Sequence, residues 1–190
     1  MMSTLENLIK SRRSIFPRMF SEEIIEDEKI EQLLEAANWA PTHKLTEPWR
    51  FTVFKGDGLK KLAQFQQELY KTKAEKSGNF DEVLYKKLGS NPLNCSHVIG
   101  IGVKISGKVP EIEETNAVAC AVQNILLTAT ELELGCYWGS GGITYFEEAK
   151  PFFGLDPEDK FMGFLFLGKL KGNLPEGRRK PIAEKVKWVS

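Results

Sequence analysis

The chain has 190 residues, 42% of them hydrophobic, which suits one compact domain over residues 1–190. Lysine plus arginine and aspartate plus glutamate number 26 each, and this balance argues against a nucleic-acid partner and against binding to an anionic membrane surface. The N-terminus lacks the long apolar segment of a secretory signal, and no run approaches the ~18 apolar residues of a membrane span, so we expect a cytoplasmic protein.

The first predicted helix lies at the N-terminus. Ser3 and Glu6 form a capping box, which predicts a helix that begins near Thr4. Because proline cannot continue a helix, we expect it to stop at Pro17. Its apolar side chains are expected to face the core: Leu5, Leu8 and Ile9.

A second helix, a strand and a third helix follow. An amphipathic pattern begins at Asp27, and Pro41 closes the helix that it predicts. Residues 50–54 are rich in residue types that favour strands. Residues 57–76 carry apolar side chains at helical spacing, which predicts a charged amphipathic helix.

The middle of the chain predicts a polar segment, a buried strand and a long helix. Residues 77–94 have a weak pattern, which indicates a mobile polar segment with one short helix around residues 80–88. Residues 97–105 have the pattern of a buried strand. Residues 116–134 predict a long helix that is central to the fold. Small or polar residues in that helix have the spacing of one close-packing stripe: Ala117, Cys120, Ala121 and Asn124.

The last predicted elements are two strands and a short helix. Residues 135–143 predict a strand that breaks into a glycine turn, and residues 160–170 predict a second strand. Between them, Thr144 and Glu147 form a capping box for a helix through Phe153. A basic tail that contains proline completes the chain.

Helices separate these strands without a regular βαβ rhythm, so we expect an α+β domain with a mostly antiparallel sheet flanked by helices. The three cysteines are odd in number and widely spaced, which excludes a disulfide framework and predicts buried thiols: Cys95, Cys120 and Cys136.

Two arginines and a serine follow the first helical turns. Arg12 and Arg13 could be solvated cations that complement the negative C-terminal end of a helix. They could also bind phosphate, because guanidinium groups bind it bidentately, and Ser14 would add a neutral donor. Taken alone, residues 11–18 favour the interpretation that these arginines are solvated.

Three further stretches carry groups that could bind a ligand. Residues 39–51 place Thr42 and His43 in a loop between two prolines, which could equally be a rigid connection. Residues 137–142 end in glycines that let the backbone approach a planar or anionic ligand, although a plain strand-end turn is commoner. Residues 177–181 contain a second arginine pair, which in isolation is more often a solvated tail.

Together, "SRRS", "APTHKLTEPWRF", "GCYWGSGG" and "RRKP" occur in an order that resembles the FMN-dependent nitroreductase family, above all its short members with an AP-x-H-K loop. The resemblance covers nearly the whole chain. It implies the nitroreductase-like α+β fold and a homodimer with the long central helix at the interface and two flavin sites.

The resemblance also implies cofactor contacts. Arg12, Arg13 and Ser14 match phosphate and ribityl contacts, and Arg178 and Arg179 match basic residues near the same phosphate. The remaining implied contacts lie in a loop that reaches the flavin from the partner subunit and in a loop along the isoalloxazine ring: Trp39, Pro41, Thr42 and His43, then Trp138, Gly139, Ser140, Gly141 and Gly142.

The implied activity is transfer of hydride from NADH or NADPH to FMN and then, in a ping-pong sequence, to an oxidised small molecule such as a nitroaromatic or quinone. This chemistry agrees with the absence of an evident nucleophile, metal cluster or catalytic dyad, because the cofactor carries it. No side chain is assigned as proton donor; His43 could transfer a proton or position the cofactor.

Other functions remain open at this stage. The same fold could serve a flavin-consuming or dehalogenating enzyme, or a non-catalytic FMN sensor or dimerisation module. A flavin-free interaction protein with a basic tail is a further alternative.

Overall fold

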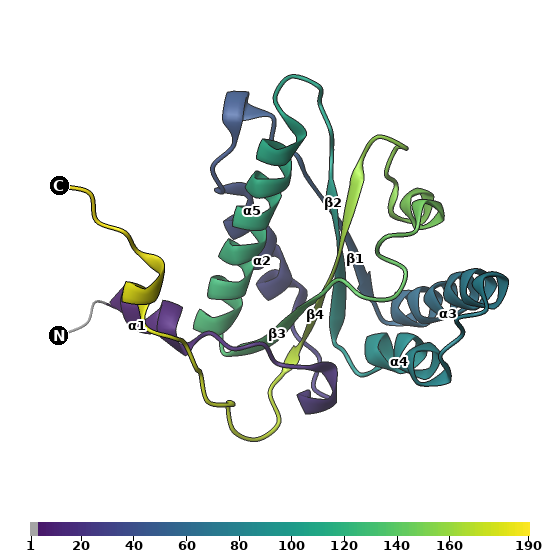
Figure 1. The fold of residues 1–190 in the computed structure, drawn as a ribbon. Coiled ribbons are helices and arrows are strands. Elements are labelled where there is room, and N and C mark those ends of the chain that lie inside the picture. The colour runs from purple at the N-terminus through teal and green to yellow at the C-terminus, as the bar shows by residue number, and fades with distance from the viewer. Residues whose placement is uncertain (1–3) are drawn as a thin grey trace.

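A computed structural model describes residues 4–190, and its centre is a four-stranded sheet (Figure 1). Every neighbouring pair of strands is antiparallel, and the strand order is β1-β2-β4-β3. The strands are β1 (Trp49–Lys55), β2 (His97–Val103), β3 (Leu134–Gly139) and β4 (Lys160–Lys169). The α+β prediction with an antiparallel sheet is therefore confirmed.

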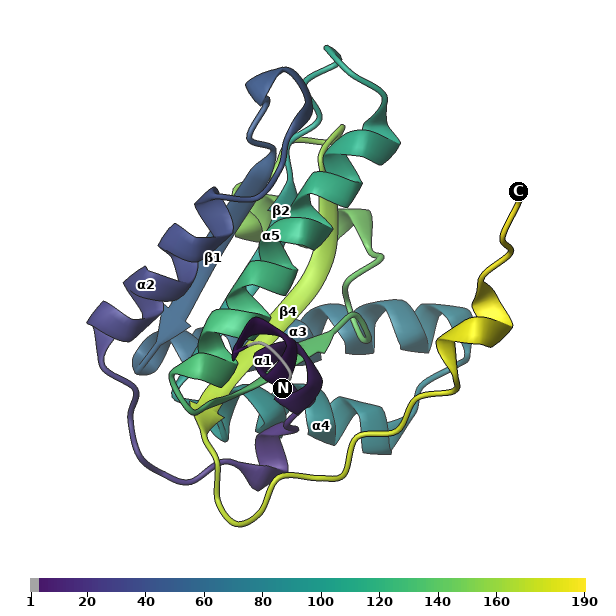
Figure 2. The same ribbon diagram turned by 90° about the vertical axis from the view of Figure 1, so that its left-hand side faces the viewer.

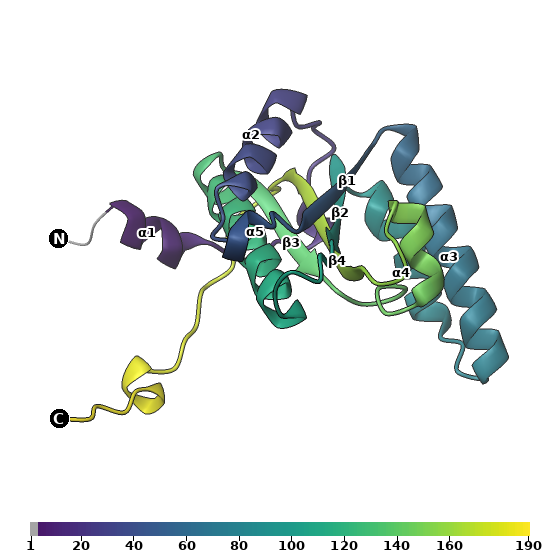
Figure 3. The same cartoon turned by 90° about the horizontal axis from the view of Figure 1, so that it is seen from above.

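Helices cover both faces of this sheet, as the view from above shows (Figure 3). On one face lie α2 (Asp27–Asn38) and α5 (Glu111–Glu131), which share a hydrophobic core with the sheet. On the other lie α3 (Asp57–Ser77) and α4 (Glu82–Leu93), which complete a second core. With apolar layers on both faces, β2 is buried along its whole length.

The first helix, α1 (Thr4–Ser11), contacts α5 from outside, and Figure 2 shows it in front of α5. The tail after β4 leaves the fold on the same side (Figures 1 and 3). The predicted inward face of α1 is wrong for the single chain, because no α1 residue is buried and Leu5 is 61% exposed. The predicted capping residue Ser3 lies outside the described residues. The helix also ends at Ser11, before Pro17. After it the chain turns toward β3, where the Ile15 side chain is buried and the Ile15 N–H donates to the Cys136 carbonyl.

The short helix predicted around residues 80–88 is present as α4, but it continues to Leu93, so the expectation that the rest of residues 77–94 is a mobile polar segment is wrong. The side chain of Asp81 accepts hydrogen bonds from the N–H groups of Val83 and Leu84 and so caps this helix. The Tyr70 hydroxyl oxygen accepts a hydrogen bond from the Asp81 N–H at 2.9 Å, which links the cap to α3.

Two helix boundaries also differ from the prediction. Helix α5 begins at Glu111 rather than at residue 116, so its first turn is acidic, which suits the positive end of a helix. The expected helix through Phe153 is a 3₁₀ helix, and Thr144 does not cap it, because its hydroxyl donates to the Gly141 carbonyl at 2.9 Å. The 3₁₀ helices are η1 (Pro17–Met19), η2 (His43–Leu45), η3 (Glu147–Phe153) and η4 (Ile182–Lys185).

The predicted close-packing stripe on α5 is split between two environments. Ala117 and Ala121 are buried in the core shared with α2, and the Asn124 side chain donates to the Ala36 carbonyl at 3.0 Å. Cys120 instead lies on the exposed side of the helix. The prediction of three buried thiols thus holds for Cys95 and Cys136 but is wrong for Cys120.

Helix length and hydropathy together rule out a membrane crossing by any helix within residues 4–190.

Candidate functional site

A cavity of about 700 Å³ lies where the end of α1 meets the C-terminal tail. We call it the arginine cavity. It is lined by all five residues predicted to surround a phosphate, together with five others: Arg12, Arg13, Ser14, Arg178 and Arg179, with Ile9, Lys10, Gln123, Glu176 and Gly177. Both arginine pairs, from opposite ends of the sequence, therefore reach one place.

The backbone after α1 explains the position of the first pair. The Arg12 N–H donates to the Leu8 carbonyl at 3.2 Å, which continues the last turn of the helix. Three residues later, the Ile15 N–H donates to the Cys136 carbonyl on β3 at 3.0 Å. Arg12 and Arg13 lie between these two fixed points, and both side chains are half-buried.

The charge of the arginine cavity is strongly positive. Its lining contains four arginines, Lys10 and one acidic residue, Glu176, whose carboxylate lies 3.9 Å from Arg178. Burial raises the pKa of the Cys136 thiol to about 12 although the Arg12 charge lowers it, so Cys136 remains a neutral thiol. A phosphate group fits this set of donors, because guanidinium groups and a serine hydroxyl supply charged and neutral N–H and O–H groups.

Arg18 does not join these arginines. Its guanidinium lies over the Phe16 ring, 5.0 Å from the ring centroid, and it lines a different cavity beside Cys95.

The glycine turn after β3 borders a second, aromatic pocket of about 410 Å³. We call it the Trp138 pocket; its lining residues are Trp138, Ser140, Tyr145, Phe161 and Met162. The Trp138 indole N–H donates to the Met162 carbonyl at 3.1 Å, which orients the ring.

A bulge in β4 positions the Met162 carbonyl that accepts the Trp138 hydrogen bond. The pairing of β2 with β4 shifts register between Gly100 and Gly102, opposite the Met162–Gly163 step. Gly163 has φ +97°, and a Cβ there would lie 2.3 Å from the Gly139 carbonyl oxygen. Glycine is therefore required at this position for β4 to approach the start of the turn.

The turn itself is open on one side. A Cβ at Gly141 would meet no atom within 4 Å, so the backbone there is accessible to a planar ligand. Gly142 has φ +68°, and a Cβ there would lie 2.5 Å from Leu88. Ser140 is exposed beside them.

The loop after α2 lies elsewhere, against the N-terminal turn of α5. His43 Nδ1 lies 2.5 Å from Glu113 Oε2, and both side chains are partly exposed. Trp39 is 80% exposed, and its indole N–H donates to Glu35 at 2.9 Å. Pro41 is exposed beside them.

The backbone of this loop is unusual. Three non-glycine residues in it have positive φ angles: Lys44, Leu45 and Glu47. Thr42 supports this conformation, because its hydroxyl oxygen accepts the Glu47 N–H at 3.1 Å and lies 3.1 Å from the Thr46 hydroxyl. Left-handed non-glycine residues are costly, so their clustering marks a loop held in one particular shape.

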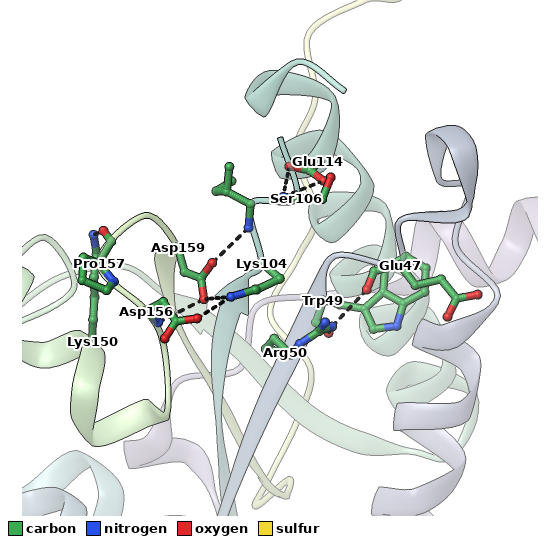
Figure 4. Close-up of polar contacts among 11 residues, drawn as sticks. Glu47, Trp49, Arg50, Lys104, Ser106, Glu114, Lys150, Asp156, Pro157 and Asp159 are labelled. Atoms are coloured by element: carbon green, nitrogen blue, oxygen red, sulfur yellow. Dashed lines mark hydrogen bonds and ion pairs between the residues drawn. The ribbon is translucent and has the colours of Figure 1, made fainter. Parts of the chain in front are cut away.

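Polar contacts also hold the adjoining end of the sheet, as Figure 4 shows. The buried Asp159 carboxylate accepts the N–H groups of Ile105 and Asp156 at 3.0 and 3.1 Å and lies 3.5 Å from Lys104 Nζ. Burial opposes ionisation, yet these donors hold the pKa of Asp159 below its usual range. Glu114 is buried as well and accepts the Ser106 N–H. The chain segments at this end of the sheet are thus fixed.

A single chain does not bring all predicted site residues together. His43 contacts Glu113, whereas the arginine cavity includes Gln123, ten positions further along α5, which is ~15 Å at 1.5 Å per residue. The Trp138 pocket and the arginine cavity share no lining residue.

Several residues at these sites were not anticipated from the sequence. Gln123, Gly177, Tyr145 and Glu113 join the sites through contacts between distant segments, for which local spacing holds no signal. Gly163 is different: a glycine inside a strand pattern often marks a bulge, so this signal was present.

The chain is similar to known proteins in sequence and in fold. The sequence profile of the Nitroreductase family matches residues 9–169. A Bacillus subtilis protein with the provisional name NAD(P)H nitroreductase YfhC is 30% identical over 190 aligned residues, which cover 96% of this chain and 93% of the relative.

Solved structures are similar over the full chain. A nitroreductase-like family protein from Bacillus cereus has a TM-score of 0.82 at 29% identity, with 100% of this chain and 97% of that chain covered. A provisionally named nitroreductase from Desulfovibrio desulfuricans, solved in complex with FMN, has a TM-score of 0.74 at 25% identity, with 100% and 99% covered.

Proposed function

The chain belongs to the Nitroreductase family, and we propose that it is an FMN-dependent oxidoreductase that uses NADH or NADPH to reduce an oxidised small molecule. A nitroaromatic or a quinone is the acceptor class that we propose. The observation that carries this proposal is the arginine cavity, in which two arginine pairs from opposite ends of the sequence surround one space.

The arginine cavity would hold the FMN phosphate. Arg12 and Ser14 would approach it from the end of α1, and Arg178 and Arg179 from the tail. Hydrogen bonds to a charged group contribute about 1.5–3 kcal/mol each, so several of them suffice to retain a phosphate dianion at the protein surface. A terminal phosphate suits this pocket, and FMN has one.

The glycine turn would lie along the isoalloxazine ring. Gly141 is accessible, and backbone N–H groups in residues 139–142 would donate to polar atoms of the ring. Trp138, held by the Met162 carbonyl, would form an aromatic wall beside it. The bulge at Gly163 supports this role because it fixes where the turn begins.

A second copy of the chain would complete each site. The loop with Trp39, Pro41, Thr42 and His43 is largely exposed and far along α5 from the arginine cavity of its own chain. In a homodimer built on the α5 face, this loop would instead reach the cofactor of the partner subunit. The strained and well-supported loop backbone agrees with a binding role.

The protein's own contribution is binding and orientation. When bound, FMN supplies the hydride and electron transfer between the nicotinamide donor and the acceptor. The arginines bind the phosphate and add positive charge, and the glycine turn orients the ring. We propose that the donor leaves before the acceptor enters, so both would use the same open space in turn.

The visible absorption spectrum of the purified protein tests this function. We expect a yellow protein that releases FMN, identified by chromatography against FMN, FAD and riboflavin standards. Steady oxidation of NADH or NADPH on addition of a nitroaromatic or quinone would then distinguish an enzyme from an FMN sensor. Release of FAD, or no flavin uptake by the colourless protein, would contradict the proposal.

A further inference from the structure

Arg13 makes a different set of contacts from its neighbour Arg12. Its Nε–H donates to the Pro175 carbonyl at 2.9 Å, and its Nη1 donates to the carbonyls of Lys10 at 2.6 Å and Arg12 at 3.0 Å. An arginine side chain has five N–H donors, so three of them are directed to backbone oxygens. One of those oxygens belongs to the C-terminal tail.

The tail also packs directly on this side chain. At Gly177, an added Cβ would lie 2.5 Å from both Cζ and Nη2 of Arg13. The guanidinium plane therefore occupies the space beside Gly177, immediately before Arg178 and Arg179. Hydrogen bonding at Pro175 and contact at Gly177 together hold the segment that leads into the second arginine pair.

The tail has little other support where it borders the arginine cavity. Every residue from 171 to 190 is exposed. In the part of the chain that the structure describes, the other side-chain hydrogen bonds of residues 172–190 run within the tail, from Arg179 to Arg178 and from Lys185 to Lys180 and Pro181. Without an anchor, such a segment would lose much backbone entropy when a ligand ordered it.

We propose that Arg13 is a positioning residue that clasps the tail and thereby brings Arg178 and Arg179 to the cofactor phosphate. This inference rests on the proposed FMN site, and it assigns the adjacent arginines different roles. Arg12 and Ser14 face the phosphate, whereas Arg13 acts on it through the tail. By ordering the tail before FMN binds, Arg13 lowers the entropic cost of phosphate recognition.

Two substitutions test this role without removing a positive charge. Arg13→Lys keeps the charge but cannot form the forked contacts, because lysine has a single ammonium group. Gly177→Ala keeps every arginine, but its methyl group displaces the Arg13 guanidinium from the tail. Arg18→Ala is the matched control, because Arg18 lies over Phe16 and lines another cavity.

Binding measurements provide the first readout. We expect Arg13→Lys and Gly177→Ala each to weaken FMN binding roughly tenfold and to change riboflavin binding by less than about twofold, since only FMN has the phosphate. In a variant that already carries Arg178→Ala and Arg179→Ala, adding Arg13→Lys should cause no further loss of FMN affinity. A further loss there would show that Arg13 contacts the phosphate itself and would overturn the proposal.

Limited proteolysis provides a readout that does not depend on flavin. Trypsin should cleave after Lys171 several-fold faster in flavin-free full-length Arg13→Lys and Gly177→Ala than in the wild type or Arg18→Ala. Unchanged cleavage rates in both variants would overturn the proposal that Arg13 holds the tail in place. If the wild type bound no flavin, the proposed function would fail, and the cleavage rates would still decide the role of Arg13.

Discussion

Arg12 and Arg179 line the same cavity, although one follows the first helix and the other lies near the C-terminus. We predict that Arg12→Ala and Arg179→Ala each weaken FMN binding about ten- to a hundredfold, because each removes a charged hydrogen-bond donor worth about 1.5–3 kcal/mol. The double variant should be non-additive, since both residues share one ligand. Titration of the flavin-free protein with FMN, followed by fluorescence, measures these affinities.

Riboflavin, which lacks the phosphate, is the control ligand, and its affinity should change little in either variant. Arg18→Ala is the control substitution, because that guanidinium lies over Phe16 instead. Equal losses of affinity for FMN and riboflavin would mean that the arginines stabilise the fold or contact the flavin ring rather than bind the phosphate.

A pair of glycine substitutions tests the backbone at the Trp138 pocket. Gly163→Ala should destabilise the protein by about 1–3 kcal/mol or more, because Gly163 has φ +97° and its new Cβ would collide with the Gly139 carbonyl. Gly141→Ala is the matched control, since no atom lies within 4 Å of its Cβ position. Thermal unfolding should show a Tm lowered by several degrees for Gly163→Ala alone; equal Tm values would contradict the bulge geometry.

The exposed side of α5 allows a test of dimerisation. Cys120 is exposed, so Cys120→Arg should leave the single chain folded but place a charge in the α5 interface of a homodimer. We expect it to elute as a monomer in size-exclusion chromatography and to lose FMN. Val83→Arg is the control, because Val83 is a 61% exposed apolar residue on α4, on the opposite face of the sheet.

Ala121→Trp would not test the interface, because Ala121 is fully buried within its own chain. That substitution should overpack the core and unfold the protein. A monomeric Cys120→Arg protein with full FMN affinity would contradict the assignment of the partner's loop to the site.

His97 should make stability depend on pH. Its ring is buried between Ser96 Oγ, 2.9 Å from Nδ1, and Asp27 Oδ1, 3.3 Å from Nε2, and Asp27 also pairs with Lys55. Burial lowers the pKa of His97, and Lys55 acts in the same direction, while Asp27 opposes them. The neutral ring satisfies these contacts when Ser96 donates to Nδ1 and Nε2–H donates to Asp27.

Because the folded pKa of His97 lies below its unfolded value of ~6.5, the unfolded state binds more protons as the pH falls. The free energy of unfolding should therefore decrease progressively below about pH 6.5. Denaturant melts between pH 7.5 and 5 should show this decrease in the wild type and in His43→Gln, but not in His97→Asn. A decrease of the same size in His97→Asn would contradict the assignment to His97.

Local features of the sequence determined most elements of the fold. Periodic apolar residues identified α2, α3 and α5, and runs of strand-forming residues identified β1, β2 and β4, because these signals depend only on neighbours along the chain. They were weaker for α4: a short helix was predicted around residues 80–88, whereas the helix that Asp81 caps continues to Leu93.

Tertiary packing determines which of those surfaces are covered and which distant groups meet. Ala121 and Cys120 belong to one predicted stripe on α5, but Ala121 is buried in the core shared with α2 and Cys120 is exposed. Two adjacent arginines look equivalent in the sequence, yet only Arg13 donates a hydrogen bond from its Nε–H to the Pro175 carbonyl of the tail. Contacts between segments far apart in the chain leave no local pattern, because either partner alone is compatible with solvent.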